Sequence, residues 1–196
     1  MAASEPNPRS DRLPPGGGDC LTTAALGERL EEEIGRAERH GTGLSCLLVV
    51  IDNLEEMARE HGGALREQTI DYAAAALRHE LRRFDRVGRV GLGGLGGHDG
   101  RESAEDLLII LPGADGPRGE IVARRALERL RTIKVEAAGA REPLRISVGL
   151  AAWQRDASAE TLLARARAAL RSVNGDPGNS LPGNAPAPVH QPTESR

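Results

Sequence analysis

Leu44 to Ile51 reads LSCLLVVI, the longest apolar run in the 196-residue chain. Eight residues are enough for a strand but far too few for a membrane helix, which needs about 20. A strand that is apolar at consecutive positions has no side suited to water, so it is expected at the centre of a sheet that is covered on both faces. The run therefore predicts a layered fold built around one central strand.

Helical spacing is found on both sides of this run. Upstream, apolar residues recur at intervals of four, four and three, and Thr22 or Thr23 is placed to cap the helix. Downstream, a second amphipathic helix is predicted to begin at about Ala64. The predicted apolar stripes are Leu26, Leu30, Ile34 and Ala37 in the first helix, and Ile70, Ala74, Leu77, Leu81 and Phe84 in the second.

The remaining segments complete an alternating order. Residues 86–91 and 106–111 are short apolar segments separated by a glycine-rich stretch, and we predict a hairpin with a long connection. A helix over 117–133, a strand over 144–153 and a last helix from Ser158 follow. The helix over 117–133 is expected to bury Ile121, Leu127 and Leu130. A hairpin inside such an order predicts the α+β class, with a mostly antiparallel central sheet flanked by helices.

Composition divides the chain into one folded domain and two tails. Residues 1–18 and 176–196 are rich in Pro, Gly, Asn and Ser and cannot bury a core, so both are predicted to be disordered. The folded domain is expected to cover 19–175. Lys134 is the only lysine among 26 basic residues, which excludes a Walker-type phosphate loop. The net charge of -3 and the aromatic content of 2% argue against nucleic acid as a partner.

Cysteine and histidine positions give no sign of a metal or of an oxidising compartment. Cys20 and Cys46 fit neither a disulfide framework nor a metal-binding spacing, and the five histidines show no ligand spacing. The N-terminus does not resemble a signal peptide. We therefore expect a cytoplasmic protein with no membrane segment, no metal and no cofactor.

Five short motifs follow one another along 19–175. They are DCLT at 19–22, DRVGR at 85–89, LLIILP at 107–112, ERLR at 128–131 and ISVG at 146–149. Their order and spacing resemble the GGDEF domain of bacterial diguanylate cyclases. The resemblance implies a nucleotide-cyclase-like fold with a ferredoxin-like palm. It also implies a reaction in which a dimer joins two GTP molecules into cyclic di-GMP, with divalent metal held by carboxylates and cations on the phosphates.

The same resemblance places the family's signature on 103–107, and the chain departs from it there. Both signature glycines are replaced, whereas two acids are kept. The aligned residues are Ser103, Ala104, Glu105, Asp106 and Leu107.

Further departures fall on the metal and phosphate positions. Val50 stands where the family has a metal-binding aspartate, and Glu55 and Asn174 stand where it has two phosphate-binding lysines. An anion in place of a cation beside a triphosphate changes the interaction by roughly 1 to 4 kcal/mol at ~4 Å. Ala58 replaces a guanine-reading Asn, although Glu67 keeps an acid at the second base-reading position. The pattern predicts a degenerate, catalytically inactive domain.

The glycine-rich insertion at 91–102 offers an alternative alignment. Within it, Gly96 to Asp99 reads GGHD and could itself be taken as the signature, with glycines that cradle phosphate. A glycine run without a following helix or cation is more often a flexible loop. The alternative would restore neither the carboxylate at Val50 nor the cation at Glu55.

An Arg-x-x-Asp motif precedes the signature, at the position of the family's allosteric product site. Arg82 and Asp85 occupy that motif, and the resemblance suggests Arg129 as a further ligand, with Arg125 as the second choice. Arginine can stack on guanine and bind phosphate through two N–H groups. The alternative is that Arg82 is a solvated charge at the end of an amphipathic helix.

Three functions therefore remain from the sequence. The first is an inactive GGDEF signalling protein that acts as a receptor for cyclic di-GMP through Arg82 and Asp85. The second is an interaction module that binds no nucleotide and contacts a partner protein or a second copy of the chain. The third, least favoured by the missing ligand and lysines, is an active diguanylate cyclase.

Overall fold

The apolar run forms β1 (Leu44–Ile51), the strand on which the layers are built. The computed structural model describes residues 20–91, 95, 106–137 and 139–173. The predicted tails lie outside the described residues, and of the insertion at 91–102 only Gly91 and Leu95 are described.

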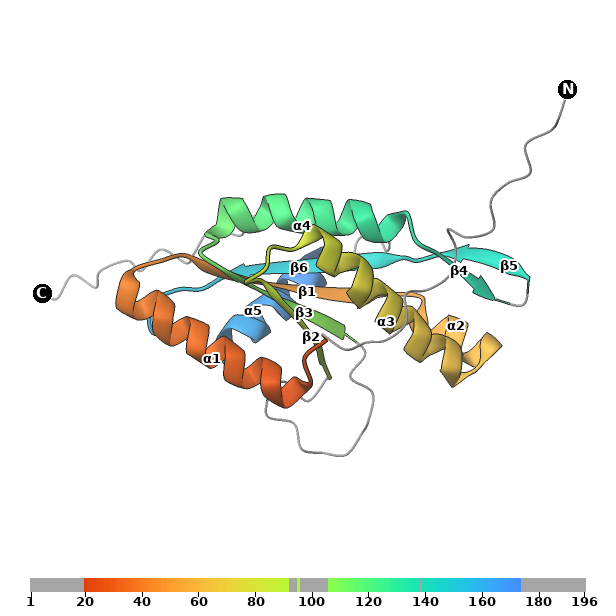
Figure 1. Ribbon diagram of the computed structural model, residues 1–196, viewed down its shortest axis with the longest axis horizontal. Coiled ribbons are helices and arrows are strands. Elements are labelled where there is room, and N and C mark those ends of the chain that lie inside the picture. Colours follow the sequence, from red (N-terminus) through yellow and green to blue (C-terminus); the bar gives the residue numbers. More distant parts are fainter. Residues whose placement is uncertain (1–19, 92–94, 96–105, 138, 174–196) are drawn as a thin grey trace, which may run out of the picture.

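The described chain contains five helices and six strands (Figure 1). The elements that precede the insertion are α1 (Thr23–His40), β1, α2 (Leu54–His61), α3 (Gly63–Glu80) and β2 (Arg86–Val90). Those that follow it are β3 (Asp106–Pro112), α4 (Gly116–Arg131), β4 (Lys134–Ala137), β5 (Ala140–Pro143), β6 (Ile146–Ala152) and α5 (Ala159–Val173). The main sheet has the order β2-β3-β1-β6, and each neighbouring pair is antiparallel. The α+β class with an antiparallel sheet flanked by helices is confirmed.

Helices cover both faces of the sheet, as the apolar run requires. On β1, Leu47, Val49 and Ile51 pack with α2, α3 and α4, whereas Cys46 and Leu48 pack with α1 and α5. Because successive strand side chains point to opposite faces, each layer takes every second residue. Buried apolar side chains at consecutive positions therefore follow from two covering layers.

The segment before α1 lies along the free edge of β2. The Leu21 N–H donates to the Val87 carbonyl at 3.0 Å, and the Arg89 N–H donates to the Leu21 carbonyl at 3.0 Å. A Cβ on Gly88 would lie 2.8 Å from the Leu21 carbonyl oxygen, so only glycine allows this close approach. Thr22 then caps α1 by accepting a hydrogen bond from the Ala25 N–H, one of the two caps expected.

Four details differ from the sequence predictions. Helix α3 ends at Glu80, so Leu81 and Phe84 lie beyond it, and Phe84 is 50% exposed. Ile121 was expected in the core but is 61% exposed on α4. The short helix α2 and the separate hairpin of β4 and β5 are not predicted by the sequence pattern.

Within the described residues, no helix combines the length and the apolarity that crossing a bilayer requires.

Candidate functional site

The position of the expected metal carboxylate is apolar. Val50 pairs with Ser147 of β6, and its side chain packs against the core between the sheet, α1 and α5. Its neighbour in the strand, Ile51, is buried on the opposite face. The end of β1 therefore offers no carboxylate until Asp52, one residue past the strand.

Two carboxylates do interact at this edge of the sheet. Asp52 Oδ2 accepts a hydrogen bond from Ser147 Oγ at 2.9 Å. Partial burial raises the pKa of Asp52, while Ser147 and Arg145 act in the opposite direction. Burial raises the pKa of Asp106 to about 6, a shift that the charge of Asp52 increases and that of Arg167 decreases.

Arg167, a cation that acts on Asp106 at this edge, comes from α5. Its guanidinium donates to the Gly91 carbonyl at 2.6 Å, just after β2 ends. The guanidinium thus joins the covering helix to the hairpin of β2 and β3 beside Asp106. Three of the aligned signature residues, Ser103, Ala104 and Glu105, lie outside the described residues, as does Asn174, whereas Leu107 is buried in the core.

The acid at the lysine position has a structural partner. Glu55 on α2 forms an ion pair with Arg66 on α3, with 3.1 Å between Oε1 and Nη2. Glu55 therefore pairs with a cation of the neighbouring helix and offers no positive charge to a phosphate. The kept acid Glu67 is also engaged, since its Oε2 lies 2.6 Å from Arg89 Nη1.

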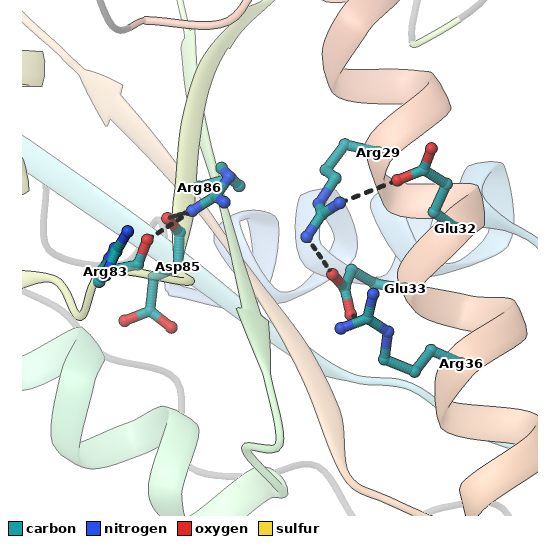
Figure 2. Close-up of polar contacts among 7 residues, drawn as sticks. All are labelled: Arg29, Glu32, Glu33, Arg36, Arg83, Asp85 and Arg86. Carbon is teal, nitrogen blue, oxygen red and sulfur yellow. Dashed lines mark hydrogen bonds and ion pairs between the residues drawn. The ribbon is translucent and has the colours of Figure 1, made fainter.

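Arg82 and Asp85 lie in one groove, at the turn between α3 and β2. Figure 2 shows Arg83, Asp85 and Arg86 of this turn. Asp85 Oδ2 accepts a hydrogen bond from the Arg82 N–H at 2.8 Å, and the Asp85 N–H donates to the Arg82 carbonyl at 3.1 Å. Arg86 Nη1 donates to the carbonyls of Arg83 and Asp85, at 2.7 and 2.9 Å. The turn is therefore held by its own backbone, which leaves the exposed Arg82 guanidinium without a hydrogen bond among the described residues.

The groove has a volume of about 520 Å³ and a positive lining. Burial raises the pKa of Asp85, although the backbone hydrogen bond of Arg82 and the charges of Arg82 and Arg86 act against that rise. The lining comes from the segment before α1, the end of α3 and the turn: Cys20, Leu21, Arg78, Leu81, Arg82, Arg83, Asp85, Arg86 and Val87.

The two arginines suggested on α4 lie elsewhere. Arg125 forms an ion pair with Glu80, the last residue of α3, at 3.1 Å. Arg129 lines a different pocket of about 300 Å³, together with Tyr72 and Lys134. The structure thus brings Arg82 and Asp85 together and pairs Arg125 with the helix that leads to them, whereas Arg129 is not among the residues that line their groove.

Several residues of these two regions are not marked by the sequence motifs. Arg78 also lines the groove and lies four residues before Arg82. Residues at that spacing share one face of a helix, so the spacing could have predicted that the two arginines lie together. No local pattern marked Arg167, which reaches the signature edge from α5, or Ser147, which reaches Asp52 from β6.

Figure 2 also shows a second charged group, on α1. Glu33 is 2% exposed, and its carboxylate lies 2.6 Å from Arg29 Nη2 and 3.7 Å from Arg36 Nε. Paired arginines are what allow a carboxylate to remain buried in a helix that faces the sheet.

Comparison with known proteins identifies the family. The model of the diguanylate cyclase GGDEF domain matches residues 21–180. A curated relative, diguanylate cyclase DgcP of Pseudomonas aeruginosa, is 30% identical over 152 residues. That match covers 75% of this chain and 20% of the relative, so the chain spans about a fifth of its length.

Solved structures have the same fold. Diguanylate cyclase SiaD of Pseudomonas aeruginosa, solved with its activator SiaC, superposes with a TM-score of 0.68 at 25% identity, over 78% of this chain and 54% of SiaD. The GGDEF domain of DgcB from Caulobacter crescentus, solved with cyclic di-GMP, gives a TM-score of 0.70 at 18% identity, over 87% and 95% of the two chains. With the family model matched over nearly the whole described fold, this chain belongs to the GGDEF family, which is homologous to diguanylate cyclases.

Proposed function

We propose that this protein is a catalytically inactive GGDEF-domain signalling protein and that it binds cyclic di-GMP in the groove of Arg82 and Asp85. The observation that carries the proposal is the contrast between two regions. The substrate edge lacks a carboxylate at Val50 and carries an acid at Glu55, whereas the Arg82 groove combines an available guanidinium with a fixed carboxylate.

The chemistry of the substrate edge argues against catalysis. Phosphoryl transfer needs divalent metal and cations to offset the charge of a triphosphate. Asp52 and Asp106 remain, but Asp106 has a pKa of about 6 and shares the edge with a second acid. At the former lysine position, Glu55 repels phosphate and is held by Arg66. The cationic half of the expected site is therefore missing at that position.

The groove suits a guanine nucleotide that carries phosphate. Its volume of about 520 Å³ lies within the common range of ligand pockets, roughly 300 to 1,000 Å³. Asp85 uses Oδ2 for the backbone of the turn, and its other oxygen remains to accept N–H groups of a guanine edge. The Arg82 guanidinium supplies two parallel donors for a phosphate.

Titration calorimetry of the full chain with cyclic di-GMP tests the receptor. We expect micromolar binding in the wild type, a loss of at least about tenfold in Arg82→Ala, which corresponds to 1.4 kcal/mol, and unchanged binding in Arg124→Ala. Arg124 is an exposed arginine of α4 outside the groove lining and serves as the matched control. Absence of heat at high ligand concentration, or equal losses in both variants, would contradict the receptor.

Incubation with GTP and Mg²⁺ tests the inactivity separately. Cyclic di-GMP should not accumulate above the level of a protein-free control. Steady accumulation would show that the edge around Val50 and Asp106 still catalyses the reaction, whatever the groove binds.

A nucleotide-independent interaction module is the second candidate, and one observation favours it. The half-exposed Phe84 lines a mostly apolar groove of about 320 Å³ that does not include Arg82. Exposed apolar side chains in a groove are typical of protein contacts. If cyclic di-GMP does not bind, this groove becomes the surface on which a partner protein or a second copy is expected.

A further inference from the structure

Three ligand atoms meet at the end of the molecule where α2 and the hairpin of β4 and β5 lie (Figure 1). His61 Nε2 lies 3.7 Å from an oxygen of Glu60 and 3.6 Å from an oxygen of Glu142. All three atoms lie within 4.8 Å of one another. Both histidine distances exceed the length of a hydrogen bond, so the atoms converge on one point without satisfying each other.

His61 is the member of this group that most needs a partner. Its Nε2 is buried and has no hydrogen-bond partner within the part of the chain that the structure describes, and its side chain is 18% exposed. A buried polar atom left without a hydrogen-bond partner carries a free-energy cost. A species bound between the imidazole and the two carboxylates would remove that cost.

The donor types and the two separations from His61 fit a small divalent ion. With metal–ligand bonds of about 2.0 to 2.2 Å, two ligands of a tetrahedral zinc ion lie roughly 3.3 to 3.6 Å apart. The two measured separations from His61 are within a few tenths of an ångström of this range. One imidazole and two carboxylates form a three-ligand set, in which water takes the fourth position.

The two elements that carry the ligands are already held together. Asn53, just before α2, is 6% exposed and donates to the Pro143 carbonyl at 3.1 Å, while it accepts from the Arg145 N–H at 3.0 Å. Glu56 on α2 pairs with Arg145 at 2.5 Å. Glu60 and His61 end α2, where the helix dipole favours a cation. These contacts already fix α2 relative to β5, so ion binding would cost little further conformational entropy.

We propose that Glu60, His61 and Glu142 bind a divalent transition-metal ion of the zinc class, which joins α2 to β5. The site is separate from the signature edge and from the groove of Arg82. No ligand spacing marks His61 in the sequence, because Glu142 lies far along the chain on β5, a strand that the sequence does not predict.

The test is a titration of the full chain, stripped of metal with a chelator, with Zn²⁺ alone by calorimetry and with Co²⁺ alone by visible absorption. We expect one ion per chain and the spectrum of tetrahedral Co²⁺. His61→Gln and Glu142→Gln should each weaken binding by at least about tenfold. The matched control His79→Gln, which replaces an exposed histidine of α3, should bind as the wild type does.

A second pair of measurements separates metal binding from folding. Glu60 is 59% exposed, so Glu60→Gln should fold normally and still bind Zn²⁺ more weakly. Zn²⁺ should raise the thermal unfolding temperature of the wild type and of His79→Gln more than that of Glu60→Gln or Glu142→Gln. Lack of saturable binding, or undiminished binding in His61→Gln, would overturn the proposal.

Discussion

At the scale of single residues, burial raises the pKa of Asp106 to about 6. An aspartate with a raised pKa holds its proton more tightly in the folded protein than in the unfolded chain. It stabilises the folded state below the unfolded pKa of about 4, and this contribution is lost as the pH rises through 6. At neutral pH the charged form of Asp106 therefore reduces stability.

Asp106→Asn should make the protein more stable at pH 7, because the amide removes the cost of a buried charge. The pKa shift corresponds to a gain on the order of 2 to 3 kcal/mol at pH 7 and to almost none at pH 4. Urea unfolding of both proteins at the two pH values measures this difference. A gain that is the same at pH 4 and pH 7 would show that the charge of Asp106 is not its source.

The residues of the site show what local sequence can and cannot predict. Val50 and Glu55 were identified as departures because their neighbours align along one strand and one helix. Their structural partners were not predicted, since Arg66 reaches Glu55 from the next helix and Ser147 reaches the edge from β6. Ion pairs and hydrogen bonds between elements depend on packing, which no spacing along the chain records.

At the scale of the elements, α5 lies very close to β6 at Gly149. A Cβ on Gly149 would collide with the carbonyl oxygen of Ala166 and with the side chain of Leu170. The absence of a side chain on Gly149 therefore sets how near α5 lies to the sheet.

Gly149→Ala should destabilise the fold by about 1 to 3 kcal/mol, because the helix must move outward and lose contacts with the sheet. Gly63→Ala is the matched control, since a Cβ there meets no atom within 4 Å and alanine favours a helix. Urea unfolding measures both. Equal stability of Gly149→Ala and the wild type would mean that α5 adapts at no cost.

The elements also explain which fold predictions succeeded. β1 was predicted with its exact bounds because its side chains are buried on both faces. Helix α2 buries mainly Leu54 and Met57, too few apolar residues for a clear period, and β4 and β5 pair only with each other. Ile121 was misplaced because α4 turns that side of its surface to the solvent.

At the scale of the whole molecule, β1 couples two cores that lie on opposite faces of one sheet. Leu47 is fully buried in the core with α3 and α4, and Leu48 is 1% exposed in the core with α1 and α5. Both side chains belong to β1. If either core is lost, β1 should lose its packing on one face, and the core on the other face should then be disrupted as well.

Leu47→Ala and Leu48→Ala should each lower the free energy of unfolding by about 2 to 5 kcal/mol. Both variants should still unfold in one step, with circular dichroism and the fluorescence of Trp153 reporting the same midpoint. Trp153 is the only tryptophan and packs with the second core. A fluorescence midpoint that stays in place while the circular dichroism midpoint falls in Leu47→Ala would show that the faces unfold separately.

The backbone bridge between Leu21 and β2 also carries a thermodynamic consequence. Cys20 and Leu21 form one wall of the Arg82 groove, so any ligand held there rests partly on the segment that leads into α1. Binding in the groove and docking of that segment on β2 are then linked equilibria, and each must strengthen the other by the same factor. Tension applied to the chain ahead of Cys20 would lower the affinity of the groove, and an occupied groove would resist that tension.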